Sequence, residues 1–148
     1  MPTTGQPEAP NDPSILPAPI QVLEQGDKTS LIIETNRSFD VAMGFTLAGS
    51  MATGLVAAPL TFTIRYYYDQ LDVAAKGLLT TVTHNTQPGQ FVYNEATPTG
   101  STTTAPVPAG KLAVGIYRLE AVVNFTIGTA SQEIYAFTDG PVIEIVNP

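Results

Sequence analysis

The stretch Gly115–Ile127, GIYRLEAVVNFTI, determines the fold that the sequence predicts. In an extended strand, one face of this stretch would carry a continuous apolar row: Tyr117, Leu119, Ala121, Val123, Phe125 and Ile127. The other face would be mixed, with Arg118, Glu120, Val122, Asn124 and Thr126. This period of two is typical of a half-buried β-strand. A slip of one residue would expose the apolar row, so we expect a well-defined register.

Alternation of the same kind recurs along the chain. The clearest further examples are 39–47 and Leu60–Asp69, LTFTIRYYYD, and weaker ones lie at 20–24, 31–35, 78–84, 90–93, 132–138 and 142–146. Turns rich in Gly and Pro separate these segments, and none has a convincing helical period. The sequence therefore predicts an all-β protein, an antiparallel β-sandwich of about seven to nine strands.

Two Pro-rich regions lie outside this pattern. Residues 1–19 contain six prolines, which block helix formation and favour an extended backbone. We expect an extended N-terminal arm at 1–19, followed by a single sandwich domain at 20–148. The Thr- and Pro-rich run 95–110 is predicted to be a long surface loop that contains an edge strand at 101–105.

Three residues at and just before the start of Gly115–Ile127 resemble a motif of a known fold. Leu112, Gly115 and Tyr117 stand as Leu-x-x-Gly-x-Tyr within residues 106–125. This spacing resembles the tyrosine corner of immunoglobulin-like and fibronectin-III-like sandwiches. The resemblance implies an immunoglobulin-like sandwich in which the Tyr117 hydroxyl bonds to the backbone a few residues upstream. The alternative is that Tyr117 is simply a core aromatic residue, and neither reading implies a function.

The composition disfavours several classes of partner. The formal net charge is −7, and the six Lys and Arg residues are scattered singly. Nucleic acids and anionic membranes need a basic patch, so neither is expected as a partner. The chain contains no Cys, which excludes disulfides and thiolate chemistry and leaves the redox compartment open.

The ends and the hydropathy of the chain bear on its location. The first residues lack a basic segment followed by an apolar run, and no apolar run has the length of a membrane span. We therefore expect no secretory signal and no membrane insertion. A protein that stays soluble where it is made fits this pattern, as does a virion or surface component that leaves the cell by another route.

Candidate catalytic and metal-binding residues are few. His84 is the only histidine, next to a predicted turn, and the chain has neither a Gly-x-Ser-x-Gly elbow nor a phosphate-binding loop. We therefore predict no enzymatic activity and no cofactor, with His84 solvated or capping the turn. Asp69 and Asp72 offer two carboxylates to Ca²⁺, but their DQLD segment has too few ligands for a typical calcium loop.

The most specific surface signal is the triple Tyr66-Tyr67-Tyr68. The alternation directs Tyr66 and Tyr68 inward and Tyr67 outward beside Arg65 and Asp69. An exposed tyrosine can stack on a sugar or anchor a protein interface, or it can serve as a cross-strand partner for Val122 or Ile116. The outer face of Gly115–Ile127 is also open to a neighbouring subunit. The predicted contact residues are Tyr67, Arg65, Ile116 and Val122.

Two functions fit these observations. The first is a non-enzymatic structural or interaction protein, a subunit of a homo-oligomer or of a larger assembly such as a virus or phage particle, a filament or a surface layer, with the arm contacting a neighbour. The second is a module that binds a carbohydrate or another ligand through Tyr67 and the adjacent loops. The expected partner is therefore a second copy, another protein or a glycan.

Overall fold

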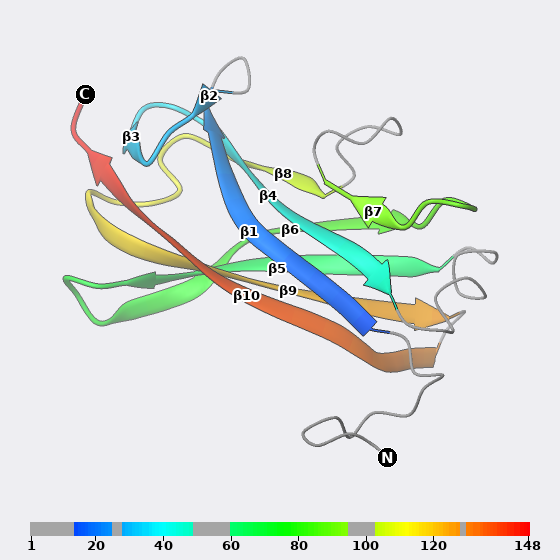
Figure 1. Cartoon of the computed structure of the whole chain (residues 1–148). Helices are drawn as coiled ribbons and strands as arrows, with labels where there is room; N and C mark the ends of the chain where they lie inside the picture. Colours follow the sequence, from blue (N-terminus) through cyan, green and yellow to red (C-terminus); the bar gives the residue numbers. More distant parts are fainter. Residues whose placement is uncertain (1–13, 25–27, 49–59, 95–102, 128–129) are drawn as a thin grey trace, which may run out of the picture.

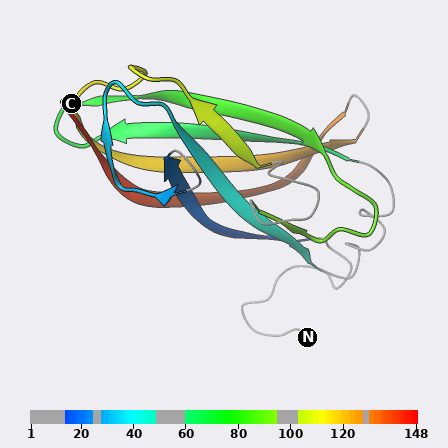
Figure 2. The same cartoon turned by 90° about the horizontal axis from the view of Figure 1, so that it is seen from above.

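The computed structural model describes residues 14–24, 28–48, 60–94, 103–127 and 130–148. These residues form ten strands and no helix. The strands make two five-stranded sheets that pack as a sandwich, and β1 and β4 of one sheet cross the strands of the other (Figure 1). Figure 2 shows the two layers from above.

The first sheet is built around β4 (Phe39–Ala48). On one side β4 pairs with β1 (Ser14–Glu24), whose far end pairs with β2 (Lys28–Thr29). On the other side β4 pairs with two short strands, β7 (Val92–Tyr93) and β8 (Thr104–Val107). The predicted edge strand at 101–105 is thus displaced along the chain, and β8 pairs with the central strand of this sheet.

The second sheet has the strand order β3-β10-β9-β5-β6. Its strands are β3 (Ile32–Glu34), β5 (Thr61–Gln70), β6 (Ala75–Asn85), β9 (Gly115–Ile127) and β10 (Ala130–Val146). The stretch Gly115–Ile127, from which the fold was predicted, is β9, and it pairs with β10 and β5 along almost its whole length. Its position in the middle of the sheet explains its strict alternation, because one face packs against the first sheet.

Two parts of the fold prediction are wrong. The structure has ten strands, because the two-residue strand β2 was not among the predicted segments, whereas β3 and β7 lie within the predicted segments 31–35 and 90–93. The sandwich is not wholly antiparallel, because β3 pairs with β10 in parallel. The chain crosses from the first sheet to the second between β2 and β3, and it reaches β10 running in the same direction.

The boundary of the predicted arm also differs from the structure. Strand β1 begins at Ser14, so residues 14–19 pair with β4, and residues 1–13 of the predicted arm lie outside the described ranges. The ladder between β1 and β4 shifts register between Pro17 and Ile20. A proline lacks the N–H group that a regular ladder needs, and such an irregularity tolerates it.

The core lies between the two sheets and confirms the inward row of β9. Tyr117, Leu119, Ala121, Val123 and Phe125 are all buried, as are the alternating residues Val41, Met43 and Phe45 of β4. An aromatic cluster joins the sheets: Phe45 packs on Phe62 and Phe125 edge to face and stacks on Tyr93, with ring centroids 5.1–5.6 Å apart. Such pairs contribute about 0.5–1.5 kcal/mol beyond the area that they bury.

A hydrogen-bonded tyrosine also joins the two sheets. Tyr66 of β5 accepts a hydrogen bond from the Met43 N–H of β4 at 2.8 Å and donates one to the Thr103 carbonyl at 2.5 Å. Its side chain is fully buried, and this burial raises the pKa of Tyr66 above its ordinary value. Because both bonds cross the sandwich, Tyr66 fixes the position of one sheet relative to the other.

A bulge in β10 directs residues on both sides of it into the same core. Asp139 is paired with Glu120 and Val142 with Arg118, so Gly140 and Pro141 together lie opposite the single residue Leu119. Gly140 has a φ of 81°, a conformation that costs other residues energy. The extra residue shifts the alternation by one position, so that Ala136 before the bulge and Ile143 after it are both buried.

Candidate interaction surface

The register of the second sheet defines its outer face. Arg65, Tyr67 and Asp69 of β5 lie opposite Val122, Glu120 and Arg118 of β9, and β10 and β6 continue the same rows. We call the four rows between Ile116 and Val122 the outer face: Glu144 and Ile116; Val142, Arg118, Asp69 and Lys76; Asp139, Glu120, Tyr67 and Leu78; Phe137, Val122, Arg65 and Thr81. Ile32 of β3 extends the first row.

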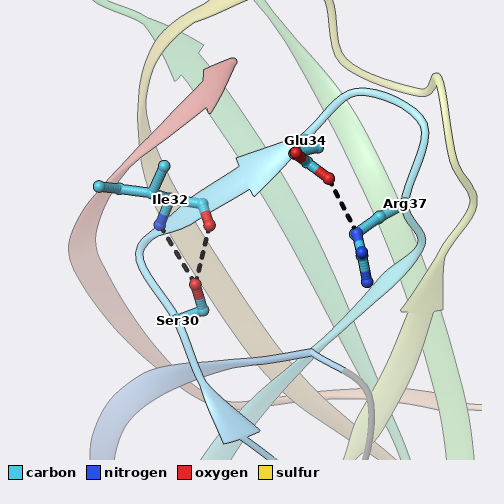
Figure 3. A network of polar contacts seen from close by, with 4 residues as sticks. All are labelled: Ser30, Ile32, Glu34 and Arg37. Carbon is cyan, nitrogen blue, oxygen red and sulfur yellow. Dashed lines mark hydrogen bonds and ion pairs between the residues drawn. The ribbon is translucent and has the colours of Figure 1, made fainter. Parts of the chain in front are cut away.

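The short strand β3 is held at the sheet edge by local polar contacts (Figure 3). The Ser30 hydroxyl donates a hydrogen bond to the Ile32 carbonyl at 2.8 Å, and the Arg37 guanidinium pairs with Glu34 at 2.9 Å. Both partners of this ion pair are substantially exposed, so the pair contributes at most about 1 kcal/mol. These contacts and the pairing with β10 position Ile32 beside Glu144, with 60% of its surface exposed.

The outer face exposes several large apolar side chains. Ile32, Leu78, Ile116, Phe137 and Val142 are between 41% and 60% exposed. Single exposed apolar residues are ordinary, but exposed apolar residues on four of the five strands of one sheet face are typical of a contact surface. The aromatic ring of Phe137 lies opposite the partly buried Val122.

The outer face also differs in charge from the rest of the chain. It holds three of the six Lys and Arg residues (Arg65, Lys76 and Arg118) but only four of the thirteen Asp and Glu residues. The formal charge is therefore −1 on this face and −6 on the remainder of the chain. Long-range repulsion between two acidic molecules is weakest where nearly neutral surfaces meet.

A pocket of about 200 Å³ opens at one side of this face. Its lining is Tyr67, Tyr68, Asp69, Lys76, Gly77, Leu78 and Glu120. The β5–β6 ladder shifts register between Tyr66 and Tyr67, which interrupts the even spacing of side chains at this point. Tyr68 packs beside Gly77, where a Cβ atom would lie 3.0 Å from the Tyr68 hydroxyl, so the absence of a side chain at Gly77 makes room for this ring. Gly77 lies within β6 rather than at a turn.

The four predicted contact residues share the outer face, but they do not form one cluster. Arg65 lies directly opposite Val122, and its guanidinium donates a hydrogen bond to the Asn124 side chain at 3.1 Å. Tyr67 is half-buried, with Glu120 on β9 and Leu78 on β6 as its cross-strand neighbours, so it pairs with neither Val122 nor Ile116. Ile116 lies at the other end of the face, where its carbonyl accepts a hydrogen bond from the Leu71 N–H.

The three residues of the predicted tyrosine corner are close together at the start of β9. The Tyr117 hydroxyl donates a hydrogen bond to the Ala113 carbonyl, four residues upstream, at 2.7 Å. Leu112 is buried, and Gly115 lies where a Cβ atom would meet the Gln70 side chain at 2.5 Å. Burial raises the pKa of Tyr117, and the negative charges of Asp72 and of ionised Tyr68 raise it further.

The two aspartates considered for calcium have separate roles in the structure. Asp69 lies on the outer face between Arg118 and Lys76, whereas the Asp72 carboxylate accepts a long hydrogen bond from the Ile116 N–H at 3.4 Å. No group of three or more His, Asp or Glu side chains with the spacing of a metal site occurs in the described ranges. His84 is exposed, and its ring lies 6.4 Å from that of its cross-strand neighbour Phe62.

The sequence analysis identified one of the five exposed apolar residues on this face, Ile116. Phe137, Val142, Leu78 and Ile32 were not identified, because their orientation depends on the β10 bulge, the β5–β6 register shift and the parallel pairing of β3. The alternation within 132–138 and within 142–146 was a usable signal for each half of β10. It did not show which residues of the first half share a face of the strand with which residues of the second.

No known protein-family model and no curated protein matches the sequence. In the part of the chain that the structure describes, nothing helical is long and apolar enough to cross a membrane.

Proposed function

We propose that this protein is a non-enzymatic structural or interaction protein, a β-sandwich subunit that functions through self-association or as part of a larger assembly. The observation that carries the proposal is the outer face of the second sheet, where exposed apolar side chains on β3, β6, β9 and β10 coincide with a nearly neutral charge. Surfaces of this kind are costly for a protein that remains monomeric, because they promote association.

We further propose that the sandwich belongs to the immunoglobulin-like class. The strand order β3-β10-β9-β5-β6 opposite a sheet of β1, β4 and β8, and the hydrogen bond from Tyr117 to Ala113, support this assignment. Many proteins of this class act by presenting a sheet face or end loops to a partner, but a fold alone does not determine a function.

The assembly proposal is tested by measuring mass against concentration. Light scattering on the size-exclusion peak of the full chain, from about 1 μM to about 1 mM, should give a mass above the 15.6 kDa of the monomer, increasing with concentration to a defined oligomer. A mass of 15.6 kDa at every concentration would contradict self-association.

A second candidate function is supported by the pocket beside Tyr67. The half-buried ring of Tyr67, next to Asp69, Glu120 and Lys76, offers a stacking surface together with hydrogen-bonding groups, a combination suited to the apolar face and the hydroxyl groups of a sugar. The pocket of about 200 Å³ is smaller than the roughly 300–1,000 Å³ of most ligand sites, which limits it to one sugar unit or a chain end.

The ligand proposal is tested on a glycan array with the wild-type protein, Tyr67→Ala and Tyr67→Phe. Stacking predicts that wild type and Tyr67→Phe bind the same glycans and that Tyr67→Ala does not. Failure of the wild-type protein to bind any glycan at high concentration would remove this candidate.

A further inference from the structure

We propose that the partner of the outer face is the same face of a second copy. The two copies are related by a two-fold axis that lies between their facing outer faces and runs at right angles to β9 near Leu119. The inference rests on the proposed assembly function and names its contact. It follows from the order of charges along β9 and from the extent of the face.

A two-fold axis in this position reverses the order of the four rows and leaves each strand facing its own copy. The row of Arg118 then faces the row of Glu120, and the row of Ile116 faces the row of Val122. At the centre, Arg118 of each copy meets Glu120 of the other, which gives two equivalent ion pairs. On either side of this centre, Ile116 meets Val122 in a symmetric apolar contact.

The neighbouring strands are compatible with the same arrangement. On β5, Asp69 faces Tyr67 of the second copy, where a phenol can donate a hydrogen bond to a carboxylate. On β10, Val142 faces Asp139 and Glu144 faces Phe137, so no carboxylate faces another carboxylate. An isologous contact requires one patch to be complementary to itself, and the outer face meets this requirement in charge.

The other two-fold arrangement is unfavourable. An axis running along β9 would place identical rows opposite each other, so that Arg118 faces Arg118 and Glu120 faces Glu120 at the centre of the contact. Juxtaposed like charges at an interface cost several kcal/mol. The charge pattern therefore selects the antiparallel arrangement.

The size of the face is adequate for a dimer. The face has 15 positions, each about 4.8 Å by 6.7 Å, and so covers about 500 Å² on each copy. A dimer would bury about 1,000 Å² in total, which is the lower limit for a specific interface. Because the rest of the chain carries a formal charge of −6, other orientations of two copies bring more like charge together.

Charge reversal across the axis tests the arrangement. Arg118→Glu places two carboxylates opposite each other in both central contacts, and Glu120→Arg places two cations there. We expect each variant alone to dimerise at least about tenfold more weakly than wild type. An equimolar mixture should recover the wild-type dimer, because the introduced carboxylate at position 118 then meets the introduced guanidinium at position 120. Lys111→Glu, an exposed loop substitution with the same charge change as Arg118→Glu, is the matched control and should retain the wild-type mass.

The outcomes separate the two proposals. A wild-type oligomer whose mass is unchanged in both variants would overturn the two-fold contact while leaving the assembly function intact. A wild-type monomer at all concentrations would overturn both. A mixture that stays monomeric although each variant is folded, as judged by circular dichroism, would also overturn the contact.

A second measurement does not depend on charge. The chain has no Cys, so Ile116→Cys and Val122→Cys each introduce a unique thiol. Positions 116 and 122 of different copies should face each other, whereas two copies of position 116 should lie about 20 Å apart along the strands. A short bis-maleimide should therefore cross-link the mixture of the two variants but neither variant alone. Equal cross-linking in all three samples would overturn the arrangement.

Discussion

At the scale of single residues, the Tyr66 hydroxyl holds the two sheets together through two hydrogen bonds. It satisfies a buried N–H group of Met43 and a buried carbonyl of Thr103, and both would lose their partner in Tyr66→Phe. We expect this variant to lose about 1–3 kcal/mol of unfolding free energy in urea denaturation. Tyr67→Phe, which removes a half-buried hydroxyl on the outer face, should change it by less than about 0.5 kcal/mol. Equal losses in the two variants would contradict the assigned role.

The hydroxyl of Tyr117 makes one such bond, to Ala113, and its ring is buried in the core. Tyr117→Phe keeps the ring and leaves the carbonyl of Ala113 without this donor. We expect a loss of about 1–3 kcal/mol, lower than for Tyr66→Phe because one bond is removed instead of two. The measurement is the urea midpoint at constant m-value. An unchanged midpoint would show that Tyr117 contributes only through its ring.

At the scale of the elements, the bulge in β10 lets one strand direct Ala136 on one side of the bulge, and Ile143 and Ile145 on the other, into the same core. Gly140 adopts a φ of 81° with no atom within 4 Å of its would-be Cβ, so Gly140→Ala should destabilise through backbone strain alone, by about 1–2 kcal/mol. Gly110 has a φ of 80° and equally open surroundings, so Gly110→Ala is the matched comparison.

We expect similar losses in both glycine variants, measured as unfolding free energy in urea. A loss at Gly140 much larger than at Gly110 would mean that the β10 ladder itself is disturbed. No loss at either position would contradict the strain argument.

At the scale of the whole molecule, buried phenols make stability depend on alkaline pH. Burial raises the pKa of Tyr66, Tyr93 and Tyr117 above the value of 10.0 expected in the unfolded chain. Their contribution to stability is therefore fully present below about pH 10 and is lost as the pH rises toward their folded-state pKa values. Above pH 10 the unfolded chain loses the proton of each such tyrosine, whereas the folded chain keeps it. The free energy of unfolding should therefore fall by about 1.4 kcal/mol per pH unit for each of them.

Urea titrations between pH 8 and pH 11 measure this dependence, with stability expected to be flat up to about pH 9.5. In Tyr66→Phe the decline above pH 10 should be shallower, because one of the three titrating groups is gone. A flat profile through pH 11, or an unchanged slope in the variant, would contradict this account.

The predictability of this fold differed between strands for a physical reason. In β9 the buried and less buried residues alternate from Gly115 to Thr126, because one face of the strand packs on the core. In β4 the inward residues Val41, Met43 and Phe45 are also the ones that the sequence indicated. In β10 the same rule applies to each half, but the bulge at Gly140 and Pro141 sets the phase between the halves. The alternation at 31–35 indicated the strand β3, but a local pattern does not show that this strand pairs with β10 in parallel.

The sequence by itself determined the all-β class, the inward row of β9 and the outward direction of Arg65 and Tyr67, because burial of one face leaves a period of two in the chain. Only the tertiary structure decided which strands are neighbours. That choice brings Phe137 beside Val122 and places Arg118, Asp69 and Lys76 in one row. Neighbour relations of this kind depend on contacts between residues far apart in the chain, and a local pattern does not record them.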